Sequence, residues 1–526
     1  MKTNTKPTHG SDRHEAHHEV VVIGGGPAGS TTAAYLAQRG FDVALYERER
    51  FPRPHIGESL LPATLAVLDD VGVLPAIEAE GFLTKWGATW SWGKSAEPWS
   101  LYFRETSASY PHAYQVSRDR FDQILLEHAA ASGTQVTQGI AVKAVHEGRV
   151  ELDDGRRIGA DIVVDASGQR SLIALARGLK RWDAHFRNLA IYGYFRGARH
   201  LEPPDESNIF IESYANGWLW KIPLASGISS VGAVVDRDFG AAGIRKAGRE
   251  RFYSDQVAAT ARASAMLEGA DFVDGPHVVR DWSYRAETLA GDGFVLVGDA
   301  ACFIDPLFST GVHLAVTGGS LAAAYVATAL RDPDLAVAAG DAYERLYLAQ
   351  YRHFHDMARL FYGTNRARES YFWEARRLTG EARFTPRTAF VRAISGQAGF
   401  QVERAALGHT PLPESFRREL DRQVVTDAAP RVEPTHATRV RLASGLEVRE
   451  QAVLGDSRFE MGHVIVGNGR DELPIGALAA ELARTASGDS LEDIASRLTN
   501  PDAKSPEHVL SAAALLIAED VLEVCS

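Results

Sequence analysis

The sequence predicts an α/β fold in which an antiparallel sheet interrupts a parallel one, followed by a mainly helical C-terminal region. Three observations predict this fold. A glycine-rich turn at residues 24–29 stands between a β-branched run and a helix-like stretch. Apolar runs at residues 161–168 and 293–299 each end in a turn, and short alternating segments fill residues 185–280. Buried runs followed by helices indicate a parallel sheet, whereas alternation of period two indicates an antiparallel one.

The composition is that of a folded, globular protein. The chain has 526 residues, of which 45% are hydrophobic and 24% charged, and this excludes wholesale disorder. A net charge of −12 argues against nucleic acid or an anionic membrane as the main partner. The two cysteines, Cys302 and Cys525, exclude a disulfide framework and favour a cytoplasmic location, and we expect no metal site. Residues 1–18 are polar, lack a secretory signal and are expected to form a disordered tail.

The first elements form a βαβ unit. Residues 19–23 are a continuous β-branched run, residues 30–38 are helix-like, and residues 41–46 give a second strand. A strand, a helix and a second strand within about 30 residues are typical of a Rossmann-like nucleotide-binding domain.

The turn inside this unit predicts dinucleotide binding. Gly24 permits the tight turn, Gly26 lets the backbone approach a pyrophosphate, and Gly29 allows the helix to pack closely on the strand. The N–H groups of the helix N-terminus, around Ala28, are free to bind phosphate oxygens. Glu47 follows the second strand and is placed to accept a hydrogen bond from a ribose hydroxyl.

The later elements complete the predicted architecture. Residues 491–498 and 506–522 are expected to be helices near the C-terminus. We predict a discontinuous nucleotide-binding domain of residues 19–184 and 281–330, an antiparallel-sheet substrate domain of residues 185–280, a helical region of residues 331–400 and a C-terminal lid or docking domain of residues 401–526.

Further motifs favour FAD over NAD. The pair Gly298-Asp299 resembles the second fingerprint of class A flavoprotein monooxygenases, as do Val116-Ser-Arg118 and residues 165–168. The resemblance implies that Asp299 hydrogen-bonds the ribityl chain of FAD and that Arg118 lies along the cofactor. No second glycine fingerprint for a nicotinamide cofactor follows, so we expect a separate flavin reductase to supply reduced FAD.

Residues 19–400 resemble, more specifically, the FAD-dependent halogenases of the chondrochloren and chloramphenicol type. The first matching motif is Trp218-Leu-Trp-Lys-Ile-Pro223, which fits the WxWxIP signature. In the family these indoles lie near the flavin and keep organic substrate away from it, which assigns that role to Trp218 and Trp220. Without the resemblance, two tryptophans in positions i and i+2 simply share one face of a strand.

The second motif, residues 303–311, fits the FxxPxxSxG pattern. The resemblance puts a chloride or bromide ion at the backbone of Thr310 and Gly311, with Pro306 and Gly311 beside the flavin. Exposed N–H groups at a helix start suit an anion. Read from the residues alone, the same segment is a helix start with a Ser or Thr cap.

Two more motifs concern the flavin and the delivery of the halogen. Residues 57–59 match the place where the family puts flavin contacts, which assigns such a contact to Ser59. Lys85 matches the family's essential lysine at the end of a tunnel from flavin to substrate, and Lys94 is the competing candidate. Desolvation lowers the pKa of a lysine, which suits either a neutral amine that accepts chlorine or an ammonium that donates to hypochlorous acid. Most single lysines, however, are solvated surface residues.

One departure from the tryptophan-specific halogenases bears on the substrate. Those enzymes have a glutamate before the Ser-Thr-Gly triplet, and this chain has Phe308. We therefore predict an electron-rich aromatic substrate, phenolic or pyrrolic, either free or bound to an acyl or peptidyl carrier protein, in secondary-metabolite (antibiotic) biosynthesis. The resemblance implies that halide attacks a flavin hydroperoxide and that Lys85 presents the resulting hypohalous acid to the ring. Glu58, His112 and Asp305 are candidates for a further acid or base.

Other functions remain open on the sequence. An aromatic hydroxylase shares the flavin motifs, a flavin-dependent prenyl reductase shares an aromatic-rich strand, and a flavin-binding sensor needs no catalysis. The segment after about residue 400 is expected to cover the substrate mouth or to dock a carrier protein, and it contains a stretch compatible with a winged-helix-like unit.

Overall fold

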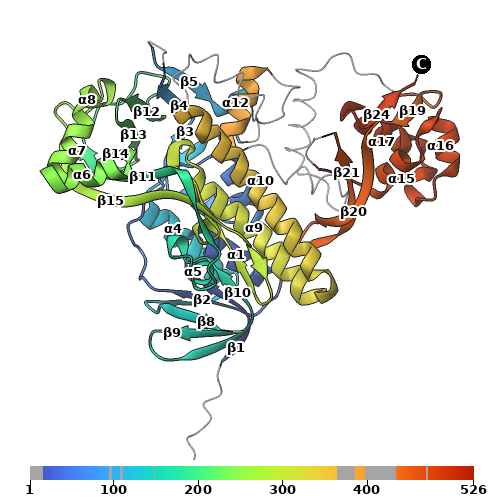
Figure 1. The fold of residues 1–526 in the computed structure, drawn as a ribbon, viewed down its shortest axis with the longest axis horizontal. Coiled ribbons are helices and arrows are strands. Elements are labelled where there is room, and N and C mark those ends of the chain that lie inside the picture. Colours follow the sequence, from blue (N-terminus) through green and yellow to red (C-terminus); the bar gives the residue numbers. More distant parts are fainter. Residues whose placement is uncertain are drawn as a thin grey trace, which may run out of the picture.

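The computed structural model describes residues 16–93, 97–106, 110–146, 148–363, 385–396, 434–468 and 472–525. Two large sheets lie side by side, and a smaller C-terminal unit is joined to them through a long hairpin (Figure 1). The predicted α/β class, with a parallel sheet and an antiparallel one, is confirmed. The C-terminal unit contains two three-stranded sheets in addition to its helices.

The parallel sheet forms the nucleotide-binding domain. Its strand order is β16-β17-β10-β1-β2-β7, and the pairs β17–β10, β10–β1, β1–β2 and β2–β7 are parallel. The strands are β1 (His17–Ile23), β2 (Val43–Glu47), β7 (Gln135–Gln138), β10 (Arg157–Asp165), β16 (Ala290–Gly291) and β17 (Phe294–Leu296), with β8 (Val142–His146) and β9 (Arg149–Leu152) as a side branch. β1 starts two residues earlier than predicted, so His17 and His18 belong to the sheet and not to the tail. Residues 1–15 lie outside the described part of the chain.

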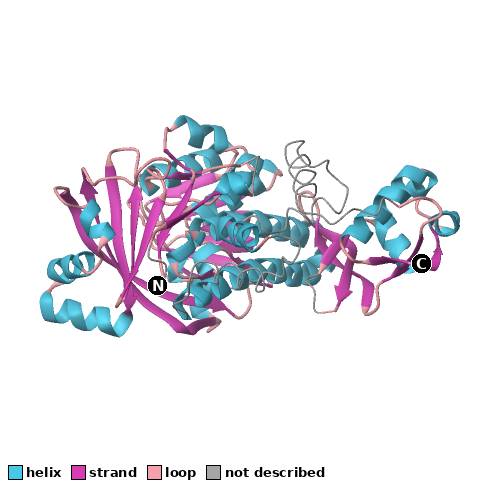
Figure 2. Cartoon of the chain, turned by 90° about the horizontal axis from the view of Figure 1, so that it is seen from above, coloured by secondary structure: helices cyan, strands magenta, loops and turns pink. Residues whose placement is uncertain are grey.

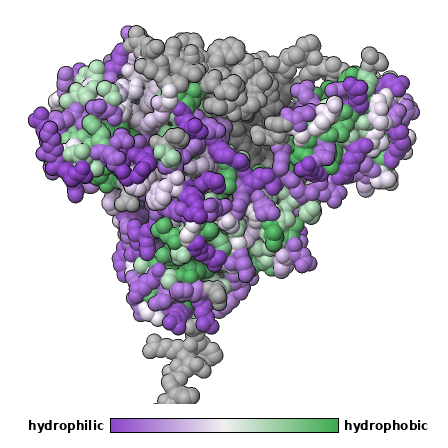
Figure 3. Space-filling view, viewed as in Figure 1, coloured by the Kyte–Doolittle hydropathy of each residue, from purple (hydrophilic) through white to green (hydrophobic). Residues whose placement is uncertain are grey.

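Helices cover the parallel sheet and connect it to the rest of the molecule. α1 (Pro27–Gln38) packs against α4 (Arg118–Ala131) and against α9 (Thr310–Arg331), which in turn packs on α10 (Ala336–Gly363). α9 is the one described helix that is long and apolar enough to cross a membrane, but 94% of its apolar window is buried inside the protein. Hydrophobic residues on the visible face form separate patches among hydrophilic ones (Figure 3).

The antiparallel sheet has the order β18-β15-β11-β14-β13-β12-β4-β5. Its strands are β4 (Gly87–Ser91), β5 (Trp99–Tyr102), β11 (Lys180–Arg196), β12 (Ile209–Tyr214), β13 (Gly217–Pro223), β14 (Ile228–Asp236), β15 (Asp271–Ala286) and β18 (Cys302–Phe303). β11 and β15 extend beyond the predicted domain of residues 185–280, and β4 and β5 come from the segment assigned to the nucleotide-binding domain. Because β4 joins β12 by parallel pairing across more than a hundred residues of sequence, local alternation does not reveal it.

The C-terminal unit is attached through β20 (Leu446–Leu454) and β21 (Phe459–Gly467). Leu454 and Phe459, at the end of this hairpin, are buried in the same hydrophobic cluster as α9 and α10. The backbone N–H of Phe459 donates to Thr328 Oγ1 at 2.8 Å, and Arg345 of α10 pairs with Glu472 at 2.7 Å. Figure 2 shows this unit on the opposite side of the central helices from the large sheets. The helix predicted for residues 491–498 is α16 (Leu491–Arg497). The helix predicted for residues 506–522 is α17 (Pro506–Ala518), which ends earlier than predicted, and Leu522 begins the strand β24 (Leu522–Val524).

Candidate active site

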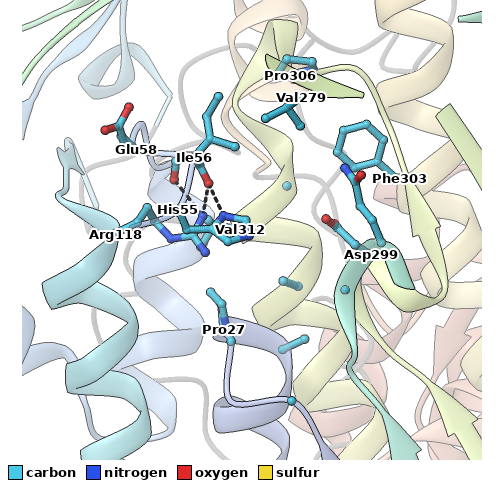
Figure 4. Close-up of a pocket in the computed structure, with 18 of the residues that line it drawn as sticks. Pro27, His55, Ile56, Glu58, Arg118, Val279, Asp299, Phe303, Pro306 and Val312 are labelled. Atoms are coloured by element: carbon cyan, nitrogen blue, oxygen red, sulfur yellow. Dashed lines mark hydrogen bonds between the residues drawn. The ribbon is translucent and has the colours of Figure 1, made fainter. Parts of the chain in front are cut away.

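A cavity of about 500 Å³ lies between the two large sheets. Its lining comes from the glycine-rich turn and the start of α1, from β11 and β13, and from the start of α9; Figure 4 labels Pro27 and Val312 at the two helix starts. Twelve of the residues predicted as site residues line it: Gly24, Gly26, Ala28, Glu47, Ser59, Arg118, Trp218, Trp220, Asp299, Pro306, Thr310 and Gly311. Gly29 and Lys85 lie outside this lining.

The glycine-rich turn shows why each glycine stands where it does. Gly24 has φ +101°, and a Cβ there would lie 2.4 Å from the carbonyl oxygen of Ala166 on the neighbouring strand-end loop. A Cβ on Gly29 would lie 1.9 Å from the carbonyl oxygen of Gly24, so Gly29 serves the close packing of helix on turn. A Cβ on Gly26 would meet only Nη2 of Arg53, at 3.6 Å, and Gly26 lines the cavity.

Glu47 organises the turn from the end of β2. Its carboxylate accepts hydrogen bonds from the backbone N–H of Gly25 at 2.6 Å and of Glu49 at 2.8 Å. It also lines the cavity, and a carboxylate has further lone pairs for a ribose hydroxyl. The ribose contact stays a prediction, whereas the contact to Gly25 gives Glu47 a structural role that the motif alone does not specify.

Arg118 is fixed by a buried ion pair that the motifs did not reveal. Its guanidinium donates to both oxygens of Asp122, at 2.7 and 2.9 Å. It also donates to the backbone carbonyl of Ile56 (Figure 4). Asp122 is 0% exposed and also lies 3.3 Å from Arg53. Arg118 and Asp122 are four residues apart at the start of a predicted helix, and side chains with this spacing lie next to each other on a helix, so the sequence contains a signal for this pair.

Asp299 stands across the cavity from Glu58 and Arg118 (Figure 4). Burial raises the pKa of Asp299 to about 6, while the positive charges of Arg118 and Lys180 act to lower it. The strand-end position at the cavity wall fits the predicted contact with the ribityl chain, whose hydroxyls are hydrogen-bond donors.

The two signature tryptophans share one face of β13 and both line the cavity, with ring centroids 5.9 Å apart. The indole N–H of Trp218 donates to the hydroxyl of Tyr362, which donates to Asp305 at 2.6 Å. The indole N–H of Trp220 donates to Ser230 at 3.3 Å. Both rings are therefore held in place, and Asp305, one of the candidate acids, is engaged in holding Trp218.

The start of α9 has the features of an anion site. Ser309, the residue before the helix, has φ +59° and its side chain makes no capping hydrogen bond, so the predicted Ser cap is wrong for Ser309. The first N–H groups of the helix, at Thr310 and Gly311, thus lack a side-chain acceptor from this residue and belong to the cavity wall. A Cβ on Gly311 would meet nothing within 4 Å, so there is open space beside it.

Lys85 is buried, with 1% of its surface exposed, on β3 (Leu83–Lys85). Its Nζ donates to the carbonyl of Leu60 at 2.8 Å and lies 5.3 Å from the centre of the Phe103 ring. Burial lowers the pKa of Lys85 to about 7. Lys94 lies outside the described residues, and His112 packs against Trp86 away from the cavity lining.

A cluster of aromatic residues lies behind the tryptophans. Phe308 is buried against Phe361, with ring centroids 5.1 Å apart, and Phe361 stacks on Phe390 of α12 (Pro386–Ser395) at 5.7 Å. Phe390 in turn contacts Trp90. The position that bears a glutamate in tryptophan-specific enzymes is thus apolar in its surroundings as well as in its side chain.

Known proteins resemble the chain over most of its length. The family described as tryptophan halogenase matches residues 19–110 and 102–407. A tryptophan 2-halogenase of Chondromyces crocatus is 36% identical over 380 residues, covering 69% of this chain and 71% of the relative. A 1H-pyrrole-2-carbonyl-[peptidyl-carrier protein] chlorinase of Pseudomonas fluorescens is 33% identical over 380 residues, covering 66% and 84%.

Solved structures of flavin-dependent halogenases have the same fold as this chain. The crystal structure of CmlS, a flavin-dependent halogenase, superposes with a TM-score of 0.73 at 28% identity, covering 97% of this chain and 96% of that one. The myxobacterial chondrochloren halogenase CndH superposes with a TM-score of 0.64 at 36% identity, covering 73% and 91%.

Proposed function

Because this chain belongs to the tryptophan halogenase family and is an FAD-dependent halogenase of the chondrochloren and chloramphenicol type, we propose that it halogenates an electron-rich phenol or pyrrole and that Lys85 delivers the halogen. The observation that carries the proposal is the buried amine of Lys85. With a pKa of about 7, a large fraction of this amine is neutral at physiological pH and able to accept a halogen.

The cavity residues divide the remaining tasks. When bound, reduced FAD would supply two electrons that convert oxygen into an oxidant for the halide. The N–H groups of Thr310 and Gly311 hold the halide, and Trp218 and Trp220 fill the wall that would otherwise admit organic substrate. Confinement matters because a free hypohalous acid reacts indiscriminately.

Residues 58–60 connect the cavity to Lys85. Glu58 and Ser59 line the cavity, and the next residue, Leu60, accepts the hydrogen bond from Lys85. The transfer proposed here therefore runs from the cavity along this segment to the amine that receives the halogen. A buried amine gives the transfer a fixed position and hence regiochemistry.

The substrate is proposed from the surroundings of Phe308. Without a carboxylate there, the ring receives no help in stabilising positive charge, so a ring that already carries a hydroxyl or a pyrrole nitrogen is required. The relative that acts on a pyrrole attached to a peptidyl carrier protein supports a carrier-bound substrate as well as a free one.

Mass spectrometry of the products tests this function. The protein is incubated with FAD, a flavin reductase, NADH, chloride or bromide, and a panel of free phenols, free pyrroles and carrier-bound pyrrolyl groups. We expect a product with the isotope pattern of the added halogen, and none when the reductase is left out. A hydroxylated product that forms with NADPH alone and without halide would contradict the proposal.

A further inference from the structure

Glu58 is a buried carboxyl group to which the steps above give no role. It is 3% exposed, lines the cavity, and stands on the opposite side from Asp299 and Phe303 (Figure 4). Its Oε2 atom has no hydrogen-bond partner. A buried carboxyl oxygen without a partner costs free energy that a purely structural glutamate would avoid.

The neighbours of Glu58 belong to the antiparallel sheet. The hydroxyls of Ser230 and Tyr194 lie beside its carboxyl group and act to lower its pKa. Ser230 also accepts from the indole of Trp220, so one hydroxyl joins Glu58 to the signature tryptophan. Tyr194 and Ser230 are cross-strand partners, which fixes the two hydroxyls relative to each other.

The backbone of Glu58 belongs to the segment that leads to Lys85. Its carbonyl accepts from Val116 at 2.7 Å, and two residues later the carbonyl of Leu60 accepts from Lys85 Nζ at 2.8 Å. The segment pairs with β6 (Ala113–Gln115), which itself pairs with β3. Glu58 therefore lies at the cavity end of a short segment whose other end, Leu60, accepts the hydrogen bond of the proposed halogen acceptor.

We propose that Glu58 is a catalytic acid, which protonates the oxygen released when hypohalous acid transfers its halogen to Lys85. This inference rests on the proposed function. The amine nitrogen forms a bond to the halogen as the halogen–oxygen bond breaks, and the departing hydroxide takes the proton of Glu58 and becomes water. The carboxylate then takes a proton from the N-halo ammonium. The sum is hypohalous acid and amine giving N-haloamine and water.

The charges around Glu58 favour the protonated form that this step needs. Burial raises the pKa of Glu58 to about 7 and Asp119 acts in the same direction, whereas the hydroxyls of Ser230 and Tyr194 and the charge of Arg118 lower it. A carboxyl group whose pKa is raised is protonated below that pKa and loses its proton as pH rises through it. The Lys85 amine is neutral above its own pKa. Halogenation should therefore rise and then fall with pH around neutrality.

Replacing Glu58 by Gln in the FAD-loaded enzyme tests the assignment. In Glu58→Gln we expect FAD affinity and oxygen consumption within about twofold of wild type, while halogenated product per oxygen falls more than about tenfold, because general acids typically contribute 10²–10⁴-fold. A trap for free hypohalous acid should collect the oxidant that the variant no longer transfers to product. The residual halogenation by Glu58→Gln should not decrease at high pH as the wild-type activity does. Glu212→Gln, which removes a buried carboxylate that caps the α8 (Arg262–Met266) N-terminus, is the matched control and should keep the product yield.

Infrared spectra give a readout that needs no product. The wild-type minus Glu58→Gln difference spectrum should contain the carbonyl band of a protonated carboxylic acid at about pH 6, and this band should vanish above about pH 8. A missing band, loss of FAD binding, or a product yield less than about tenfold below wild type would each overturn the role of Glu58. If wild type itself makes no halogenated product, the proposed function fails, and the infrared band still decides whether Glu58 holds a proton.

Discussion

Arg118 and Asp122 show how a single pair of charges shapes the cavity. The pair is buried and bidentate, and the arginine also holds the backbone carbonyl of Ile56, next to the segment that contains Glu58. Gly57 has φ +102°, which favours glycine, and a Cβ there would also lie 2.8 Å from Nη1 of Arg118. The arginine thus positions the cofactor-facing loop in addition to any contact with FAD.

Removing the carboxylate should therefore damage both stability and cofactor binding. Asp122→Ala leaves the buried charge of Arg118 with fewer partners, and we expect a loss of about 3 kcal/mol in the free energy of unfolding and weaker FAD binding. Glu287→Ala, which breaks the half-exposed pair with Arg181, should cost less than about 1 kcal/mol. Urea unfolding measures the free energy of unfolding of each variant, and FAD titration measures its affinity for the cofactor. Equal losses in the two variants would contradict the structural role of Asp122.

The sequence predicted many residues of the cavity but not their supports. The glycines, Arg118, Asp299 and the tryptophans belong to motifs that chemistry constrains, so they are recognisable from spacing. Tyr362 and Ser230, which hold the tryptophan indoles, come from other elements. Such contacts depend on how distant segments pack, and no local pattern predicts them.

At the scale of elements, the β1–turn–α1 unit was predicted closely because strand, turn and helix are adjacent in sequence. α1 begins at Pro27 instead of residue 30, since proline suits the first turn of a helix. The antiparallel sheet was predicted only in part, because β4 enters it by a parallel pairing with β12. Pairing across a long stretch of sequence is set by the fold as a whole.

The glycine-rich turn offers a test that separates backbone strain from steric conflict. Gly24 and Gly40 both have positive φ, +101° and +85°. A Cβ on Gly24 would lie 2.4 Å from the Ala166 carbonyl oxygen, whereas a Cβ on Gly40 would meet nothing within 4 Å. Gly40→Ala should cost about 1 kcal/mol and leave FAD binding intact. Gly24→Ala should cost more and abolish FAD binding. Retention of wild-type FAD affinity in Gly24→Ala would show that the turn does not need to approach the cofactor.

At the scale of the molecule, the flavin cavity and Lys85 are separate places joined by residues 58–60. The C-terminal unit reaches the central helices through Leu454 and Phe459, on the side away from the large sheets. Its proposed role in covering the substrate mouth or docking a carrier protein stays a prediction, and residues 397–433, which precede it, lie outside the described residues.

Halogenation as proposed depends on the transfer of halogen from the flavin cavity to the buried amine. The most direct measurement is the yield of halogenated product per oxygen consumed in Lys85→Met, compared with wild type and with Lys221→Met. Lys221 is a second buried lysine, on the same strand as the tryptophans but pointing to the other face of the sheet by alternation, with a pKa lowered by burial to about 8.

The predicted result is that Lys85→Met consumes oxygen at a near-normal rate and makes no halogenated product, while Lys221→Met makes as much as wild type. Near-normal halogenation by Lys85→Met would contradict the proposed transfer, because the halogen would then reach the substrate without the amine.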